Sequence, residues 1–132
     1  MNTPEYLIQN AKKYPNEPAL SSKDDSGSWQ IYNWSEVYAN VNDVAKSLVH
    51  NGISKDDKVS IYGYNRKEWN YTYLGTQFIN AVAVGIYHTS SSEEVQWVAG
   101  NSDSKIIFVG NNPNDNQEED KMPIHRLIKV LP

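Results

Sequence analysis

Between Lys58 and Gly110, segments with a strand-like apolar pattern alternate with segments whose apolar residues have helical spacing. Three short apolar runs have the length and composition of β-strands, whereas the segments between them carry apolar residues at helical spacing. The expected strands cover residues 58–64, 81–87 and 105–110, and the expected helices run from about 66 to 80 and onward from Ser92. Alternation of strand and helix builds a parallel sheet covered by helices. The pattern therefore predicts an α/β fold with a partial parallel sheet and flanking helices.

The first 32 residues predict a helix and then a hairpin. Thr3 is suited to cap the helix, Pro4 to open its first turn, and Pro15 to end it. Short strands are expected at residues 19–22 and 29–32. The turn between them is polar and contains glycine, which is typical of a β-hairpin.

The clearest amphipathic helix begins after Asn33. Asn33 and Glu36 have the spacing of a capping box, and the Asn51-Gly52 pair is suited to close the helix. The residues that recur at helical spacing are Trp34, Val37, Tyr38, Val41, Val44, Ala45, Leu48 and Val49. One face of this helix should therefore be buried.

The later helices carry similar signals. Asn65 is expected to cap the helix that follows it, with Trp69, Leu74 (or Tyr73) and Phe78 as its buried face. Ser91 and Glu94 repeat the capping-box spacing, and Val95 and Val98 are expected to face the sheet. The strand at 81–87 contains almost no polar residue, which predicts that both of its faces are covered.

Composition narrows the possible functions. The chain has 132 residues, enough for one domain, and a formal net charge of −4, which disfavours nucleic-acid binding. There is no cysteine, so disulfides, thiolate metal sites and cysteine nucleophiles are excluded. His50, His88 and His125 lack metal-ligand spacing. The N-terminus lacks signal-peptide features and no apolar run reaches the roughly 20 residues that span a bilayer, so we expect an intracellular protein, cytoplasmic or peripheral on a membrane.

The segment from His88 to Ser92 is the best site candidate. It follows an expected parallel strand at the sheet edge where ligands gather in α/β folds. Its hydroxyl groups and the first amides of the next helix could bind an anion. A Ser/Thr-rich turn that caps a helix explains the same residues and is the favoured interpretation.

Other polar segments are weaker candidates for a binding or catalytic site. Gly110–Asn116 follows a strand but lacks phosphate-loop spacing, so a solvent loop is favoured. Tyr64-Asn65-Arg66 also follows an expected strand, where Arg66 could pair with Glu68 or a neighbouring loop, and a phosphate-binding role for Arg66 is the weaker interpretation. The acidic groups, which are Asp24-Asp25, Asp56-Asp57 and Glu118-Glu119-Asp120, are expected to be solvated turn charges rather than catalytic pairs.

The last part of the sequence changes character. Residues 111–120 are polar and acidic, which predicts a surface loop, and Leu127, Ile128 and Leu131 suggest a short final helix. Because no strand follows that helix, we expect the chain to be a truncated piece of a larger domain.

Five segments in order carry a resemblance to a known family. They are Tyr32-Asn-Trp-Ser-Glu-Val37, Asp57-Lys-Val-Ser-Ile-Tyr62 with Asn65-Arg-Lys-Glu-Trp69, Asn80-Ala-Val-Ala-Val-Gly-Ile-Tyr-His-Thr89, Ser91-Ser-Glu-Glu-Val95, and Asn101-Ser-Asp-Ser-Lys-Ile-Ile-Phe-Val109. Over nearly its whole length the chain resembles the beginning of an AMP-forming (adenylate-forming) acyl-CoA synthetase. It looks most like the long-chain fatty acid–CoA ligases of the bubblegum type.

The resemblance implies a two-step ligase that uses ATP, Mg²⁺ and CoA. A long-chain fatty acid carboxylate attacks the α-phosphate of ATP, and the CoA thiol then displaces AMP. The family's phosphate loop, Ser-Gly-Thr-Thr-Gly-x-Pro-Lys-Gly, is absent from the 132 residues, as are its catalytic Lys and later motifs. Residues 1–132 are therefore expected to be the N-terminal part of the AMP-binding (adenylation) domain, inactive alone, with no tight cofactor binding.

The resemblance implies candidate site residues in one turn of this chain. The turn formed by His88 and Thr89 matches a turn that lies near the CoA pantetheine channel in relatives. The expected partners are a long-chain fatty acid and the remainder of the synthetase chain, with no nucleic acid and at most a peripheral membrane contact.

Two other functions remain open. A non-enzymatic α/β module could dock on a synthetase or bind a ligand without turnover. A flavodoxin-like or dinucleotide-binding domain is disfavoured, because no Gly-x-Gly-x-x-Gly follows any expected strand.

Overall fold

The computed structural model describes residues 2–110. Its elements follow the order expected from the sequence. They are α1 (Thr3–Lys13), β1 (Pro18–Lys23), β2 (Trp29–Asn33), α2 (Trp34–His50), β3 (Lys58–Gly63), α3 (Lys67–Phe78), β4 (Val82–Tyr87), α4 (Ser92–Asn101) and β5 (Ile106–Val109). The expected solvent loop after Gly110, the acidic run at 118–120 and the expected final helix lie outside the described residues.

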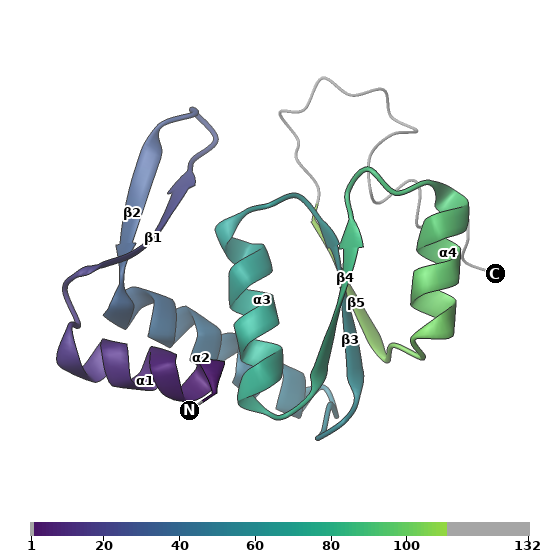
Figure 1. Ribbon diagram of the computed structural model, residues 1–132, viewed down its shortest axis with the longest axis horizontal. Helices are drawn as coiled ribbons and strands as arrows, with labels where there is room; N and C mark the ends of the chain where they lie inside the picture. The colour runs from purple at the N-terminus through teal and green to yellow at the C-terminus, as the bar shows by residue number, and fades with distance from the viewer. Residues whose placement is uncertain (1, 111–132) are drawn as a thin grey trace.

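The two sheets confirm the predicted fold class. Strands β1 and β2 form an antiparallel hairpin, and β4, β3 and β5 form a parallel sheet in that order. Figure 1 shows α3 on one side of the parallel sheet and α4 on the other, with the hairpin standing apart beyond α3. All three parallel strands run the same way, so their carboxyl ends lie at one edge of the sheet.

Helix α2 supplies much of the core. Its buried residues are Val37, Val41, Ala45 and Leu48, four of the apolar positions expected from the sequence. Leu7 of α1 and Tyr71 of α3 join Val37 and Val41 in one apolar cluster, while Leu48 packs with a second cluster around β3. Both halves of the predicted capping box are present, because Asn33 accepts from the Glu36 amide and Glu36 accepts from the Asn33 amide. Gly52 follows the helix with a φ of 80°, as the expected Asn51-Gly52 ending requires.

Two predicted helix caps were wrong. Helix α1 is capped by Asn2, which forms a capping box with Glu5, so Thr3 is already inside the helix. Helix α3 begins after Arg66 rather than after Asn65, and no side chain caps it. In both places the true cap lies one residue from the predicted one.

Helix α3 and strand β4 also differ from expectation. The buried residues of α3 are Tyr71, Thr72, Gly75 and Thr76, whereas the expected Trp69, Leu74 and Phe78 are only partly buried. Within residues 2–110, strand β4 lies at an edge of the sheet, and Val82 and Tyr87 are 45% and 81% exposed. The prediction that both faces of the strand at 81–87 are covered was therefore wrong. Among residues 2–110, the central strand β3 is the one that is buried on both faces.

Helix α4 matches its prediction. Ser91 and Glu94 form a capping box, Val95 is fully buried, and Val98 packs with it against Tyr62 and Ile86 of the sheet. Within residues 2–110, no helix combines the length and the apolar character needed to cross a bilayer. In the same range no three His, Asp or Glu side chains are grouped so that they could hold a metal ion.

An ion pair between Asp57 and Lys105 joins the residue before β3 to the residue before β5. Its carboxylate accepts hydrogen bonds from Lys105 Nζ at 2.8 Å and from the Ser54 amide at 2.8 Å, and its side chain is 15% exposed. The bond from Lys105, followed by those from Ser54, lowers the pKa of Asp57 from 3.8 to about 2. Asp57 is thus not merely a solvated turn charge.

We expect Asp57 to make stability depend on pH below about 4. Its pKa is depressed in the folded state, so its contribution is complete above the unfolded value and is lost as pH falls toward about 2. Urea unfolding of the wild type and of Asp57→Asn should therefore differ most near neutral pH and converge near pH 2. A constant difference across this range would contradict the proposed role of Asp57.

Candidate functional site at the carboxyl edge of the sheet

The ends of β3 and β4 form one wall of a cleft. Gly63 pairs with Tyr87 in the last register position, so the loops that follow these strands start side by side. Tyr64 from the first loop stacks on His88 from the second, with ring centroids 4.6 Å apart and planes 29° apart. The structure therefore joins two aromatic side chains that are 24 positions apart in the sequence.

The cleft at this edge has a volume of about 480 Å³. It is lined by Gly63, Asn65, Trp69, Gly85, Ile86, Tyr87 and His88. His88 thus lies at the carboxyl end of a parallel strand, as the sequence predicted, and the structure shows in addition that it lines a cavity. Thr89 is exposed and does not line this cleft. Any function of His88 and Thr89 stays a prediction.

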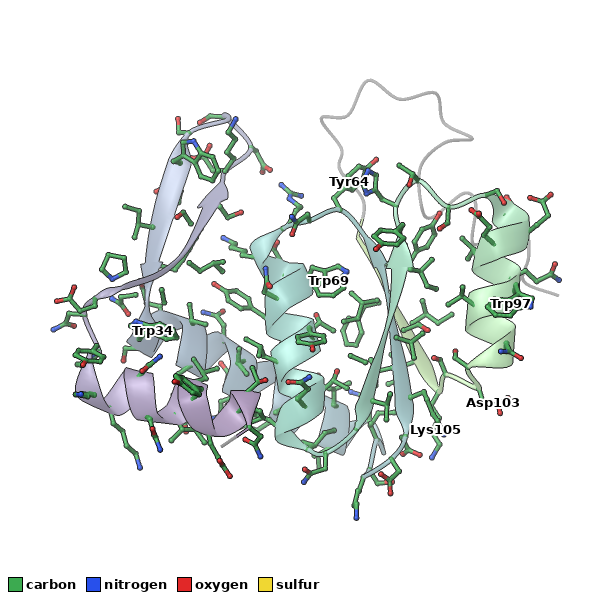
Figure 2. The ribbon with its side chains drawn as sticks, viewed as in Figure 1. Trp34, Tyr64, Trp69, Trp97, Asp103 and Lys105 are labelled. Carbon is green, nitrogen blue, oxygen red and sulfur yellow. The ribbon has the colours of Figure 1, made fainter. Side chains whose placement is uncertain are left out.

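Trp69 is a lining residue that the sequence did not assign to the site. Figure 2 shows its ring on α3 directed toward the sheet, with Tyr64 above the strand ends. A Cβ atom added to Gly85 of β4 would lie 3.4 Å from Trp69 Cζ2, so the absence of a side chain at Gly85 leaves the indole close to the strand. The sequence predicted burial for Trp69 as part of the apolar face of its helix, but only the folded chain shows that its ring lines a cleft.

The neighbouring end of β5 approaches β3 very closely. The Gly110 amide donates to the Tyr62 carbonyl at 2.7 Å, and a Cβ atom on Gly63 would lie 2.9 Å from Gly110 Cα. A second cleft of about 400 Å³, lined by Tyr64, Trp69 and Gly110 among others, opens beside this contact. Glycine at position 63 is therefore needed for the two strands to meet at this edge.

The turn before α4 does not offer a free anion site. Ser91 Oγ accepts from the Glu94 amide at 3.2 Å, and the Ser91 amide donates to Glu94 Oε2 at 2.7 Å. Glu93 and Glu94 place two carboxylates in the first helical turn. These groups already complement the positive end of the helix, so the capping interpretation of this turn holds.

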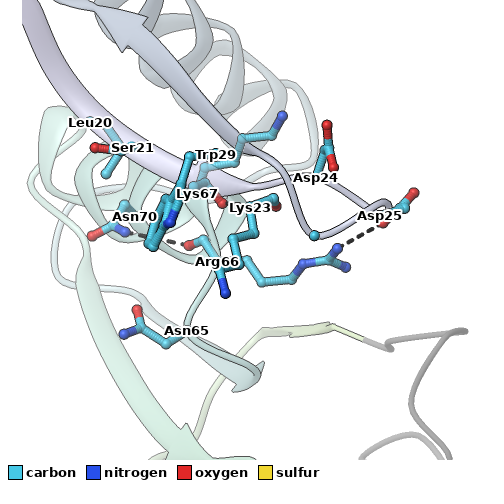
Figure 3. A pocket seen from close by; sticks show the side chains of 12 residues that line it. Leu20, Ser21, Lys23, Asp24, Asp25, Trp29, Asn65, Arg66, Lys67 and Asn70 are labelled. Carbon is cyan, nitrogen blue, oxygen red and sulfur yellow. Dashed lines mark hydrogen bonds and ion pairs between the residues drawn. The ribbon is translucent and has the colours of Figure 1, made fainter.

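A third cleft of about 580 Å³ lies between the hairpin and the start of α3. Figure 3 shows Lys23, Trp29 and Asp25 on the hairpin side, and Arg66 and Lys67 on the helix side. Each cation has a partner inside the cleft or at its border. Lys23 lies over the Trp29 ring, and Arg66 pairs with Asp25 at 3.0 Å. The cations are thus already engaged, and we assign no anionic ligand to this cleft.

Lys67 contacts the base of the hairpin. Its Nζ donates to the Tyr32 hydroxyl at 2.6 Å and lies 4.5 Å from the centre of the same ring. This hydrogen bond is the main cause that raises the pKa of Lys67, so the ammonium stays charged. Burial raises the pKa of the nearby Tyr71, whose hydroxyl has no hydrogen-bond partner within the described residues.

Asp24 shapes the hairpin turn. One carboxylate oxygen accepts from the Ser26 and Ser28 amides, and the other accepts from Gln30. Hydrogen bonds led by that from the Ser26 hydroxyl lower the pKa of Asp24 to about 2. Together with the Asp25–Arg66 pair, this shows that the acidic pair at the hairpin has specific structural partners. Solvated charge was therefore an incomplete interpretation of Asp24 and Asp25.

Comparison of the sequence with models of known protein families identifies the family of this chain. The model of the family described as "AMP-binding enzyme" matches residues 7–132, nearly the whole sequence. The chain belongs to the AMP-binding enzyme family. The membership predicted from the ordered motifs is thus confirmed.

Curated relatives of this AMP-binding chain are much longer proteins. The human long-chain-fatty-acid–CoA ligase ACSBG2 is 33% identical over 111 residues, which make up 84% of this chain and 16% of the human protein. The mouse ACSBG2 ligase is 35% identical over the same share of each chain. The AMP-binding chain therefore spans about one sixth of the length of the curated relatives it matches.

Solved structures agree with the fold. A Mycobacterium tuberculosis fatty acyl CoA synthetase superposes with a TM-score of 0.70 at 26% identity, covering 80% of this AMP-binding chain and 20% of that chain. VinN, solved with 3-methylaspartate, superposes with a TM-score of 0.78 and covers 97% of this chain and 32% of that one. VinN is 15% identical, so it supports the fold alone.

Proposed function

We propose that these residues form the N-terminal part of the adenylation domain of a long-chain fatty acid–CoA ligase. The complete reaction converts ATP, a long-chain fatty acid and CoA to acyl-CoA, AMP and pyrophosphate. The human and mouse relatives named above, which carry this activity in their names, support the proposal. So does the fold shared with a fatty acyl CoA synthetase at 26% identity.

Within that ligase, the carboxyl-edge cleft is proposed to be a wall of the CoA-binding region. The observation that carries this assignment is the stack of Tyr64 on His88 beside a cleft of about 480 Å³. Aromatic rings with Trp69 behind them provide an apolar surface with polar edges, which suits a thiol-bearing chain that carries amide groups. His88 and Thr89 remain the proposed CoA-side residues, and of the two only His88 lines the cleft.

The chemistry of the first step is proposed to depend on residues outside this sequence. Phosphoryl-group chemistry needs cationic and backbone donors that meet the charge developing on phosphate, and a bound Mg²⁺ would contribute to that charge stabilisation. Residues 1–132 contain no phosphate loop. The cations that line the hairpin cleft are paired with Asp25, Trp29 and Tyr32.

We therefore expect the purified 132-residue chain to show no ATP–pyrophosphate exchange with palmitate. Radiolabelled pyrophosphate incorporation into ATP measures this reaction directly. The positive control is the human ACSBG2 ligase assayed in parallel. Fatty-acid-dependent exchange by the 132-residue chain, above a blank without protein, would show that the catalytic groups are present here after all.

A further inference from the structure

Two side-chain contacts join the hairpin to the first turn of α3. Arg66 pairs with Asp25 at the hairpin tip at 3.0 Å, and Lys67 donates to Tyr32 at the hairpin base at 2.6 Å. The partners are 41 and 35 positions apart in the sequence, so these contacts exist only in the folded chain. They hold the hairpin against the loop that leaves β3.

The backbone of Arg66 also takes part in two hydrogen bonds within this loop and the first turn of α3. Its amide donates to the Tyr64 carbonyl at 2.9 Å, and its own carbonyl accepts from the Trp69 amide at 3.1 Å. Arg66 occupies the N-cap position of α3, but its side chain makes no cap bond and extends to Asp25 instead. The start of α3 is therefore held from outside the helix, by the hairpin.

The same loop carries one ring of the candidate site. Tyr64 lies two residues before Arg66 and stacks on His88 at 4.6 Å. Asn65, between them, lines both the hairpin cleft and the cleft at the carboxyl edge. A continuous series of contacts thus runs from Asp25 through Arg66 and Tyr64 to His88.

We infer that Asp25 and Arg66 are positioning residues that set the geometry of the Tyr64–His88 wall. The functional meaning of that wall, as part of a CoA-binding region, rests on the proposed function. The geometric link rests only on the contacts above. The side chains of Arg66 and Asp25 are 33% and 73% exposed, so the pair adds little to global stability. Its effect is expected on the orientation of the loop.

The His88 ring provides a local probe of this link. The ring current of Tyr64 shifts the proton resonances of a stacked imidazole, so a change in the stack changes the chemical shift. We would record imidazole resonances of the 132-residue chain at one fixed pH and assign His88 by comparison with His50→Gln and His125→Gln.

Loss of either partner should move the His88 resonances in the same direction. Asp25→Asn and Arg66→Gln each remove the ion pair, and the double variant should shift no further than the larger single change, because both act through one contact. Asp25→Glu keeps the charge and should restore most of the wild-type shift. Asp43→Asn, which breaks the exposed Asp43–Lys46 pair on α2, is the matched control and should leave His88 unchanged.

Salt gives an independent version of the test without substitution. About 1 M NaCl screens exposed charge pairs, so it should shift His88 in the wild type and have much less effect in Asp25→Asn. Unchanged His88 resonances in both single variants would overturn the inference. An equal shift in Asp43→Asn would also overturn it, since it would reveal a general charge effect. These outcomes involve no CoA, so they are separate from a failure of the proposed ligase function.

Discussion

Replacing Gly75 with alanine is expected to destabilise the protein, although alanine normally favours a helix. Gly75 lies in the middle of α3 where this helix crosses α2. An added Cβ atom would lie 2.7 Å from Val44 Cγ1, 2.9 Å from Val44 Cβ and 3.1 Å from the Val41 carbonyl oxygen. Val44 is β-branched and stiff, and the Val41 contact is backbone, so neither yields without moving α2.

The size of this effect follows from two opposing terms. Overpacking a core typically costs about 1–3 kcal/mol. The gain in helix propensity from glycine to alanine is about 0.5–1 kcal/mol. We therefore expect a net loss of roughly 1–2 kcal/mol in the free energy of unfolding, measured by urea denaturation.

Gly100 offers the matched control. It lies in α4, its added Cβ atom would meet nothing within 4 Å, and its φ is not in the left-handed region. Gly100→Ala should therefore stabilise the protein by about 0.4–1 kcal/mol. If Gly75→Ala proves as stable as Gly100→Ala, the close approach of α2 and α3 does not exist in solution.

The local signals of the sequence were sufficient for most of the fold. The capping boxes at Asn33 and Ser91 are made by residues within one turn of each other, so their spacing alone identifies them. The buried stripe of α2 and the order of strands and helices likewise follow from short-range periodicity. These features depend little on contacts between residues that are far apart in the sequence.

Features decided by distant contacts were harder to predict. Asn65 has the chemistry of a cap, yet α3 starts at Lys67, where Arg66 is held by Asp25 of the hairpin. The apolar run at 81–87 has the composition of a central strand, but strand order places β4 at an edge within the described residues. Nothing in the run itself reveals its place in the sheet.

The candidate site was partly predictable for the same reason. His88 could be placed at the carboxyl end of a strand because parallel strands in α/β folds present that edge to ligands. Its partner Tyr64 could not be identified, since the stack depends on the register that sets Gly63 opposite Tyr87. Trp69 was expected to be buried and instead lines the cleft.

The largest expected effect concerns the whole ligase. We would replace the 111-residue segment of human ACSBG2 that aligns with this chain by the corresponding residues of this chain. If these residues form the N-terminal wall of the same active site, the chimera should convert palmitate, ATP and CoA to palmitoyl-CoA. A rate within about tenfold of the human enzyme corresponds to a barrier change of about 1.4 kcal/mol, which suits a substituted wall with its catalytic residues retained.

Gly63→Val in the chimera provides a control for the wall itself. A side chain at Gly63 would collide with the Gly110 backbone, because even its Cβ atom would lie 2.9 Å from Gly110 Cα. This variant should lose most of the activity of the chimera. Val49→Ala, at a side chain of α2 that is 56% exposed, should retain it.

Palmitoyl-CoA formation by this chimera is the most direct measurement of whether the chain is part of a fatty acid–CoA ligase. Product should accumulate only when ATP, CoA and palmitate are all present, and a human enzyme that lacks the 111-residue segment should make none. A chimera that folds, shown by a single cooperative thermal transition and a monodisperse elution profile, but makes no more palmitoyl-CoA than a blank without enzyme would contradict the assignment.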